Sequence, residues 1–368
     1  MGVPQCDADL LYACRFTCAD PIAWFQHHGS SYLLVSDLDA PDARRSASVD
    51  TVLPLSEAFA RLRERRVARI DLPRALGEAL RARGARRVEV PATFPAAALA
   101  SLRQAGLRPI IAQRAFFTGR ARKSPWEIRA LRAALRATEA GLTEARRVLS
   151  SSRIGADGFL YLGRRRLTSE LLRERAERAM FDAGALPERS IAAGGRQGAD
   201  PHHRGAGPLR AHAPIVLDFF PRHRASGYYG DLTRTWVKGR ADARTRKAFQ
   251  AVRRAQKLAF DLIRHGAQGR RIHASVCRFF EQAGYPTRKD GGRREGFFHG
   301  TGHGLGLELH EAPGITTRPS RLEEGHVITV EPGLYYPDWG GIRIEDVVRV
   351  HRRGCTRLSR FPVFLEVP

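Results

Sequence analysis

The stretch Phe298-His-Gly-Thr-Gly-His-Gly-Leu-Gly-Leu-Glu-Leu-His-Glu-Ala-Pro313 decides the interpretation of this 368-residue chain. It places His299, His303 and His310 on a backbone with glycine at positions 300, 302, 304 and 306. Glycine lets a backbone pass close to a ligand, and neutral imidazole suits divalent transition metals. The stretch therefore predicts a metal site, although a glycine-rich turn with solvated histidines would show the same pattern.

Four carboxylates near this stretch fall inside or at the ends of apolar, strand-like runs: Asp218, Asp231, Glu331 and Glu345. A carboxylate half-buried in a sheet is costly unless it is paired or binds a metal. Any one of them alone would more often be a salt-bridged strand end. Four of them together with His303 predict a dinuclear divalent-metal site.

A dinuclear metal site is typical of enzymes that hydrolyse their substrates. Two ions about 3.5–4 Å apart can hold a bridging water, lower its pKa and stabilise the oxygen that develops on an attacked carbonyl. His299 and His310, together with His202 or His203, could donate hydrogen bonds to the substrate or to a tetrahedral intermediate. The pattern therefore indicates hydrolysis of an amide.

The composition argues against several other classes of protein. With 43% hydrophobic residues the chain can build full cores, and it has no run of about 18 apolar residues, so we expect a cytoplasmic protein without a membrane span. The 62 basic residues exceed the 38 acidic ones and give a net charge of +24, which raises nucleic acid as a partner. Because only five of the 62 are lysine and the arginines are scattered, a bias toward arginine explains the charge better than a nucleic-acid surface. The five scattered cysteines predict free thiols.

Residue periodicity predicts two domains. Residues 1–120 show the spacing of a small α/β domain, with strands at 31–36, 67–71, 87–90 and 107–112 and helices at 56–65 and 95–104. Ser124, Pro125 and Glu127 mark a strong helix start that opens the second domain. Residues 121–368 are predicted to be α+β, with helices at 125–149, 168–183, 244–265 and 272–283 and strands at 214–220, 228–237, 327–331, 342–350 and 362–366.

From about residue 120 to 366 the chain resembles the pita-bread metallopeptidases, which include methionine aminopeptidase, aminopeptidase P, prolidase and creatinase. The resemblance rests on ordered motifs: Asp-Phe with Gly-Tyr-x-x-Asp-x-Thr-Arg-Thr, His-Gly-x-Gly-His-Gly-x-Gly-Leu-x-x-His-Glu, Glu-Pro-Gly-x-Tyr, and Ile-Arg-Ile-Glu-Asp. It implies a pita-bread catalytic domain over 121–368. It also implies a smaller creatinase/prolidase-type N-terminal domain over 1–120.

The resemblance also implies a ligand set for two divalent metal ions per subunit, with manganese as the first expectation and cobalt or zinc as alternatives. Asp218 would bind one ion and His303 the other, and Asp231 and Glu345 would bridge the pair. Glu331 would bind the second ion and act as the general base toward the bridging water.

Further positions match substrate-binding and orienting residues of the family. His299 and His310 match histidines that bind substrate and stabilise the intermediate, and His202 matches a further active-site histidine, although the adjacent His203 leaves that assignment open. Three more residues match positions that orient the carboxylates or face the substrate: Thr233, Tyr335 and Arg343.

The spacing of the two aspartates is one departure from the family. Asp218 and Asp231 are thirteen residues apart, slightly more than is usual, with the extra residues around 221–226. A longer hairpin can still bring both strands into register, so we expect both aspartates to remain ligands.

The resulting hypothesis is a metal-dependent exopeptidase that releases the N-terminal residue from substrates with proline in the second position, either an Xaa-Pro aminopeptidase or an Xaa-Pro dipeptidase. The two-domain length favours this branch, and the resemblance implies a homodimer. The alternative is a binding protein that keeps the pita-bread fold without peptidase activity and uses its basic surface on nucleic acid. A third possibility is hydrolysis of a non-peptide amide, because one fold can serve several substrates.

Overall fold

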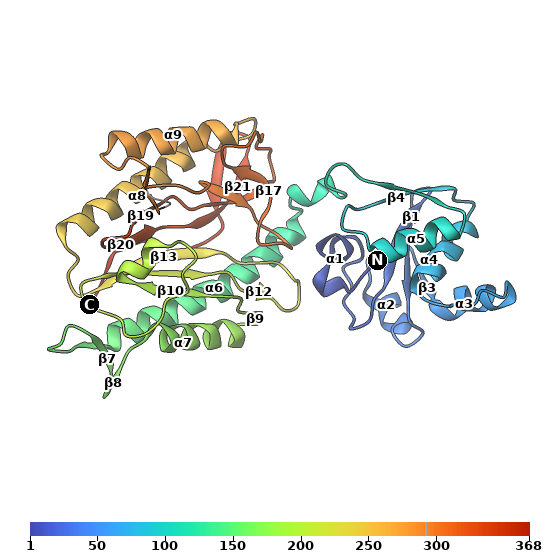
Figure 1. The fold of residues 1–368 in the computed structure, drawn as a ribbon, viewed down its shortest axis with the longest axis horizontal. Coiled ribbons are helices and arrows are strands. Elements are labelled where there is room, and N and C mark those ends of the chain that lie inside the picture. The colour runs from blue at the N-terminus through green and yellow to red at the C-terminus, as the bar shows by residue number, and fades with distance from the viewer. Residues whose placement is uncertain (291–292) are drawn as a thin grey trace. The chain divides into compact units, whose positions relative to one another are not determined.

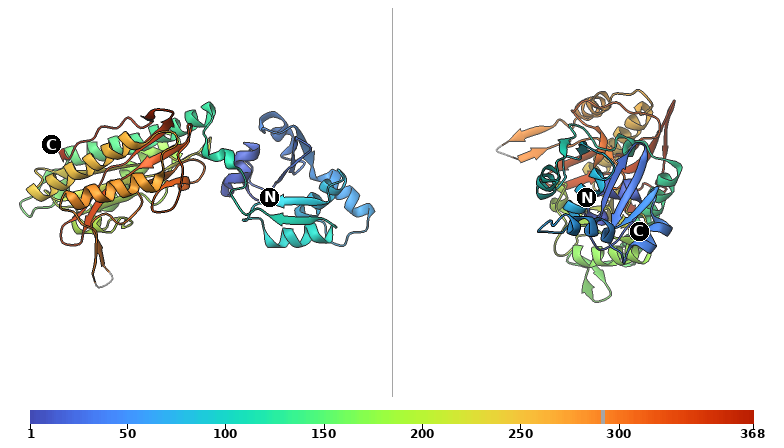
Figure 2. Two further views of the ribbon diagram at one scale, coloured as in Figure 1. Left: turned by 90° about the horizontal axis from the view of Figure 1, so that it is seen from above. Right: turned by 90° about the vertical axis from the view of Figure 1, so that its right-hand side faces the viewer.

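The structure, a computed structural model, describes residues 1–290 and 293–368. The chain forms two compact units, Met1–Arg120 and Ala121–Pro368. Figures 1 and 2 show the helices and strands of both units.

The N-terminal unit contains two small sheets and five α-helices. One sheet has the order β1-β2-β3, and the other consists of β4 and β5. The strands are β1 (Ala23–His27), β2 (Ser30–Val35), β3 (Thr51–Pro54), β4 (Arg87–Val90) and β5 (Arg108–Ile111). The helices are α1 (Ala8–Cys14), α2 (Ala40–Ser46), α3 (Leu55–Glu64), α4 (Leu72–Arg81) and α5 (Ala96–Gln104).

The strand predicted at 67–71 is wrong, because these residues form the loop between α3 and α4. The Val67 amide donates to the Leu62 carbonyl and closes the last turn of α3. The Asp71 carboxylate accepts a hydrogen bond from the Arg74 amide and caps α4, a helix that the periodicity did not reveal.

In the described part of the C-terminal unit, four α-helices enclose the strands in two pairs, α6 with α7 and α8 with α9 (Figure 1). They are α6 (Pro125–Ser151), α7 (Ser169–Asp182), α8 (Ala243–Leu262) and α9 (Gly269–Gln282). A capping box starts α6, since the Ser124 hydroxyl accepts from the Glu127 amide while the Glu127 carboxylate accepts from the Ser124 amide. The four predicted helices are therefore present, with ends shifted by a few residues.

Two sheets form the middle of this unit, with orders β10-β11-β13-β23 and β17-β16-β18-β21-β22. Their strands are β10 (Ile191–Gly194), β11 (Pro214–Phe219), β13 (Leu232–Lys238), β16 (Gly302–Gly304), β17 (Glu311–Ile315), β18 (Val327–Val330), β21 (Asp346–His351), β22 (Gly354–Arg357) and β23 (Glu366–Val367). Short ladders add β6 (Arg153–Ile154), β7 (Leu160–Leu162), β8 (Arg165–Arg166), β9 (Ala185–Leu186), β12 (Arg222–His223), β14 (Arg288–Asp290), β15 (Arg293–Glu295), β19 (Gly333–Tyr336) and β20 (Gly340–Arg343).

Three predicted strands differ from the structure. Residues 228–231 precede β13 instead of belonging to it, because the chain passes close to α6 there: a Cβ on Gly230 would lie 2.7 Å from the Ala134 backbone. The predicted strand 342–350 is interrupted between β20 and β21, where the Glu345 amide donates to the Thr233 carbonyl. Of the predicted strand 362–366 only its last residue belongs to a strand, since the Arg234 side chain binds the carbonyls at 361 and 362.

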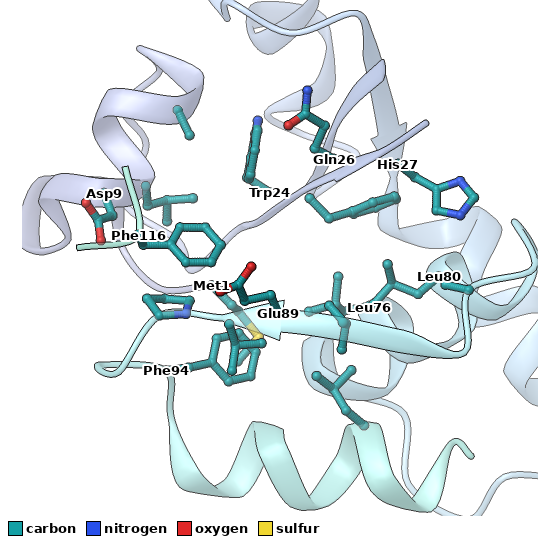
Figure 3. A pocket seen from close by; sticks show the side chains of 18 of the residues that line it. Met1, Asp9, Trp24, Gln26, His27, Leu76, Leu80, Glu89, Phe94 and Phe116 are labelled. Carbon is teal, nitrogen blue, oxygen red and sulfur yellow. The ribbon is translucent and has the colours of Figure 1, made fainter. Parts of the chain in front are cut away.

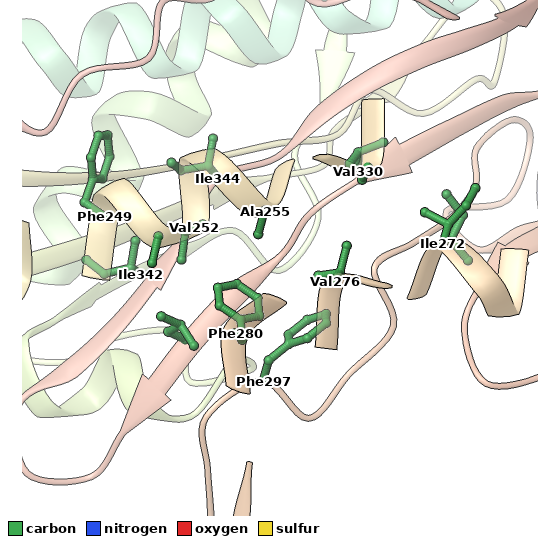
Figure 4. Close-up of a cluster of buried hydrophobic side chains, with 14 of the residues drawn as sticks. Phe249, Val252, Ala255, Ile272, Val276, Phe280, Phe297, Val330, Ile342 and Ile344 are labelled. Carbon is green, nitrogen blue, oxygen red and sulfur yellow. The ribbon is translucent and has the colours of Figure 1, made fainter. Parts of the chain in front are cut away.

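One core of the C-terminal unit lies between the helices α8 and α9 and the strands. Figure 4 shows Phe249 and Val252 of α8 and Val276 and Phe280 of α9 among buried side chains that include Ile342. This packing fixes the strands whose ends carry the predicted metal ligands. Within the part of the chain that the structure describes, none of the helices combines the length and the apolar composition of a bilayer-spanning segment.

Candidate metal centre

The two aspartates of the predicted ligand set lie on neighbouring strands. Asp218 in β11 is paired in register with Thr233 in β13, and Asp231 immediately precedes β13. The thirteen-residue interval is accommodated because part of it forms β12, which pairs with β9. The longer hairpin thus keeps both aspartates at one end of the sheet.

His303 and the two glutamates come from the second sheet. His303 lies in β16, which pairs with β18. Val330 of β18 pairs with Asp346 of β21, so the adjoining Glu331 and Glu345 lie where these two antiparallel strands meet the site. The fold therefore brings together ligand candidates that lie in or next to five strands, β11, β13, β16, β18 and β21.

Side-chain atoms of these residues converge closely. Ligand atoms of Asp231, His303 and Glu345 all lie within 4.8 Å of one another. The Nε2 atom of His303 is 3.7 Å from Asp231 Oδ2 and 3.4 Å from Glu331 Oε1. Asp218 completes the group from β11, and its Oδ1 atom is buried without a hydrogen-bond partner among the described residues.

The carboxylates of the group carry more negative charge than nearby cations offset. Burial, followed by repulsion from Glu345, raises the pKa of Asp231 well above its usual range. Burial and repulsion from Glu331 do the same to the pKa of Glu345. Burial raises the pKa of Glu331 to about 8 even though Arg343 opposes the shift. The group therefore lacks positive charge.

His303 is poised as a neutral ligand. Burial, with a smaller contribution from His310, lowers its pKa to about 4. Its Nδ1 lies 3.1 Å from the Gly304 carbonyl oxygen, which requires the proton on Nδ1 for a hydrogen bond. The Nε2 lone pair then faces carboxylate oxygens, an arrangement that repels unless a cation lies between them. Four carboxylates, one neutral imidazole and an unpartnered oxygen thus fit divalent metal ions.

Arg343 links the metal group to a second hydrogen-bonded chain. Its Nη2 donates to Asp218 Oδ2 at 2.7 Å, and its Nη1 donates to the Tyr335 hydroxyl at 2.8 Å. That hydroxyl lies 2.8 Å from His299 Nε2, while His299 Nδ1 lies 2.8 Å from the Gly300 carbonyl oxygen. Burial lowers the pKa of His299 to about 3 and raises the pKa of Tyr335 to about 12. Both ring nitrogens of His299 are therefore engaged within the protein.

Hydroxyl groups hold two of the glutamates. Thr233 Oγ1 donates to Glu345 Oε2 at 2.8 Å, and Arg343 Nε donates to the same hydroxyl oxygen at 3.2 Å. Thr329 Oγ1 lies 3.4 Å from Glu331 Oε1 and also accepts from the His303 amide. These contacts fix the orientation of the carboxylates.

A cavity of about 770 Å³ opens onto this group. Of the predicted site residues it is lined by His202, Asp218, His299, His303, His310, Glu331 and Arg343. Asp231, Glu345 and Tyr335 lie behind this lining and are buried. Of the two adjacent histidines, His202 lines the cavity, whereas His203 accepts the Gly205 amide at Nδ1.

The sequence interpretation missed several residues of the cavity wall. Arg189 lines the cavity, and its backbone has a φ of 43°, a left-handed conformation that is uncommon for a residue with a side chain. Arg204 and Phe220 also line it. Arg189 and Arg204 belong to no motif, and a chain so rich in arginine gives no reason to single them out. Phe220 directly follows the Asp-Phe motif, so its place beside the site could have been predicted from the sequence.

Comparisons with known proteins agree with this geometry. The sequence model of metallopeptidase family M24 matches residues 117–352. The uncharacterized peptidase YqhT of Bacillus subtilis is 36% identical over 174 residues, which cover 47% of this chain and 46% of that protein. An Xaa-Pro dipeptidase of Pyrococcus furiosus is 33% identical over 187 residues, covering 50% of this chain and 49% of that protein. The chain thus spans about half the length of the curated relatives it matches.

A solved structure extends the likeness to the whole fold. The X-Pro aminopeptidase of Thermotoga maritima superposes with a TM-score of 0.83 over 100% of this chain and 96% of that chain, at 23% identity. At this identity the likeness establishes the fold alone, and it confirms the predicted α+β pita-bread architecture. Because the family match covers more than half of the residues, the predicted family is also confirmed. The chain belongs to metallopeptidase family M24.

Proposed function

We propose that this protein is a metal-dependent exopeptidase that releases the N-terminal residue from substrates with proline in the second position. The relatives include an Xaa-Pro dipeptidase, and a solved structure with the same fold is an X-Pro aminopeptidase. The observation that carries the proposal is the convergence of buried carboxylates on a neutral His303 beside a cavity large enough for a peptide.

The five residues Asp218, Asp231, His303, Glu331 and Glu345 would hold two divalent ions. When bound, the ions would supply an activated water and Lewis-acid stabilisation of the attacked carbonyl. Manganese is the proposed ion, and cobalt and zinc are the alternatives, since carboxylate and imidazole together suit all three.

The residues around the ions have three roles: proton transfer, stabilisation of the oxyanion and orientation of neighbouring side chains. Glu331 takes the proton from the attacking water and passes it to the departing proline nitrogen, held for this by Thr329. His310 and His202 reach the cavity from different segments and donate to the oxygen that develops on the carbonyl carbon. Arg343 orients the Asp218 carboxylate through its 2.7 Å hydrogen bond and also donates to the Tyr335 hydroxyl.

Arg189 supports dipeptides as the preferred substrates. It lines the active-site cavity and has no hydrogen-bond or ion-pair partner among the described residues. A free guanidinium at this position suits the terminal carboxylate of a dipeptide. Arg189→Ala should therefore raise KM for an Xaa-Pro dipeptide by about tenfold and leave KM for the corresponding Xaa-Pro amide unchanged.

The deciding experiment compares chelated and metal-restored protein on three substrates: an Xaa-Pro dipeptide, an Xaa-Pro-Yaa tripeptide and an Xaa-Ala dipeptide. Chelation should abolish hydrolysis, and manganese, cobalt or zinc added singly should restore it. The proline substrates should be preferred over the alanine one. Equal activity of chelated and restored protein, or no preference for proline, would contradict the proposal.

A further inference from the structure

His310 reaches the active-site cavity from the end of the loop between β16 and β17. Its ring packs edge-to-face against His303, with the ring centroids 4.3 Å apart. His299 and His303 each have a ring nitrogen within 3.1 Å of a backbone carbonyl oxygen, whereas neither ring nitrogen of His310 has a hydrogen-bond partner among the described residues. The position of the His310 imidazole therefore depends on the backbone that carries it.

The residue after it, Glu311, holds this backbone. Glu311 is the first residue of β17 and pairs in register with Gly304 of β16. Its Oε1 accepts a hydrogen bond from the Glu308 amide at 3.1 Å. The carboxylate also lies over Gly306, where an added Cβ would be 2.5 Å from Oε2. The Glu311 carboxylate is therefore packed into the loop that leads to His310.

Lys123 fixes the Glu311 carboxylate from the start of α6. Its Nζ lies 2.7 Å from Glu311 Oε2, and the two side chains are only 2% and 5% exposed. Lys123 directly precedes Ser124, which caps α6, and its amide donates to the Gly325 carbonyl at 2.9 Å. The backbone of Lys123 is thus held in place, and its ammonium group provides a fixed contact for the loop.

An ion pair in the N-terminal unit shows how unusual this burial is. Asp9 lines a cavity of about 410 Å³ there (Figure 3), and it lies 2.7 Å from Arg120. The Asp9 side chain is 21% exposed and that of Arg120 is 14% exposed. Water can therefore reach both charges and lower the cost of bringing them together. The Lys123–Glu311 pair has almost no such contact with solvent.

The cost of burial indicates what the Lys123–Glu311 pair contributes. Attraction between two buried charges repays their loss of hydration only when the geometry is good, and apolar residues of similar size commonly give equal stability. A charge-assisted hydrogen bond, however, fixes the distance and direction between its partners more closely than apolar packing does. The pair therefore serves the geometry of the loop more than its stability.

We propose that the Lys123–Glu311 ion pair positions His310 for the peptide hydrolysis proposed above, on which this inference rests. Neither residue of the pair is among those that line the active-site cavity. Both are therefore positioning residues, which act on the substrate through His310.

The first test replaces both residues, Lys123→Met together with Glu311→Met, so that no unpaired charge stays buried. Because apolar residues can replace a buried ion pair, the midpoint of denaturant unfolding and the metal content should stay close to those of the unaltered protein. For an Xaa-Pro dipeptide, kcat should fall by about thirtyfold while KM changes by less than about twofold, since a displaced donor loses its effect mainly in the transition state. If the double variant fails to fold, Glu311→Gln replaces it, because the amide keeps the shape of the carboxylate.

A double-mutant cycle with His310→Ala shows whether the pair acts through His310. His310→Ala alone should lower kcat by about a hundredfold, the loss typical of an oxyanion donor. Adding the changes at Lys123 and Glu311 should then lower kcat by no more than about twofold further. Equal losses with and without His310 would overturn the inference. An unchanged kcat for His310→Ala would overturn it too, whereas metal dependence and the preference for proline test the exopeptidase activity itself.

Hydrogen exchange provides a measurement that needs no substrate. The amides of residues 305–310 should exchange at least about tenfold faster in the double variant. The matched control is Lys257→Met, which breaks an exposed pair with Asp261 on α8 and should change neither this exchange nor kcat by more than about twofold. Exchange in the double variant within about twofold of the unaltered protein would overturn the inference. If the unaltered protein hydrolyses no Xaa-Pro substrate, the proposed function fails, and the exchange alone decides whether the pair holds the loop of His310.

Discussion

Two buried carboxylates that are adjacent in the sequence, Glu345 and Asp346, show how differently this protein treats buried charge. Asp346 is fully buried, and Arg234 lies 2.9 Å from it as an equally buried partner. The Ser359 hydroxyl and the Gln256 amide also donate to Asp346. Glu345 is also buried, but among the described residues its carboxylate accepts a hydrogen bond from the Thr233 hydroxyl alone, and it faces other acids.

The difference separates a structural group from a functional one. A buried carboxylate normally requires a cation and hydrogen bonds to remain ionised at acceptable cost, and Asp346 has both. Glu345 has neither in full, and its neighbour Asp231 shares the deficit. A protein keeps such a deficit where a bound cation removes it, so the comparison predicts opposite consequences when each group is altered.

The largest effect is expected from Asp231→Asn. A neutral amide is a weaker metal ligand than a carboxylate, so metal binding should weaken and turnover should fall by roughly 10³-fold or more, because bound ions would supply several kcal/mol of transition-state stabilisation. In the presence of a chelator the same variant should unfold at a higher temperature than the unaltered protein, since one of the mutually repelling carboxylates is gone. Metal analysis, an Xaa-Pro assay and thermal unfolding with chelator measure the three consequences.

The control for that prediction is the chelated protein itself. A lower unfolding temperature for the chelated variant than for the chelated parent would show that Asp231 is satisfied without metal, and the contrast with Asp346 would be lost.

Arg234→Met tests the other half of the comparison. It leaves Asp346 buried without its main cation and frees the carbonyls of Phe361 and Pro362, so the free energy of unfolding should fall by about 3–5 kcal/mol. Denaturant unfolding measures this loss. Adding Asp346→Asn to the variant should recover part of the loss, and no recovery would mean that the carbonyl contacts, not the ion pair, dominate.

The role of Glu345 could be predicted from the sequence, whereas that of Asp346 could not. Glu345 could be found because it interrupts an apolar run and belongs to an ordered series of acidic motifs. The opposite treatment of Asp346 could not be predicted, because its partners Arg234, Gln256 and Ser359 come from distant segments. Arg189 was not predicted as a site residue for a similar reason, since its position at the cavity depends on tertiary structure that no local pattern encodes.

Local patterns were most informative where the signal itself is local. The helix that begins at Pro125 was predicted from its capping residues, and the structure contains the capping box. The apolar residues at 67–71 resembled a strand, but they form a loop because Asp71 caps the following helix. The end of the chain misled the prediction because the Arg234 side chain, not a neighbouring strand, binds the carbonyls at 361 and 362.

A smaller effect is expected from Tyr335→Phe, which cuts the chain from Arg343 to His299 and leaves the metal group intact. The Arg343 guanidinium would lose one acceptor and His299 Nε2 one donor. Turnover should fall by about tenfold while two metal ions per chain are retained. Metal content and kcat measured on one preparation check this, and loss of metal would show instead that Tyr335 supports the ligand geometry through Arg343.

The smallest effect concerns His326, a buried histidine outside the metal group. Its Nδ1 accepts the Glu323 amide, and burial lowers its pKa to about 4, although the nearby Glu323 charge opposes the shift. An unfolded histidine takes up its proton near pH 6.5, so the unfolded state binds more protons than the folded state between about pH 6.5 and 4. The free energy of unfolding therefore falls as the pH falls through this window. His326→Gln keeps an acceptor without a titrating group, and it should remove about 1–2 kcal/mol of this loss after allowance for solvent screening. Denaturant unfolding of both proteins at pH 7 and pH 4.5 measures the difference, and parallel losses would show that His326 does not titrate differently in the two states.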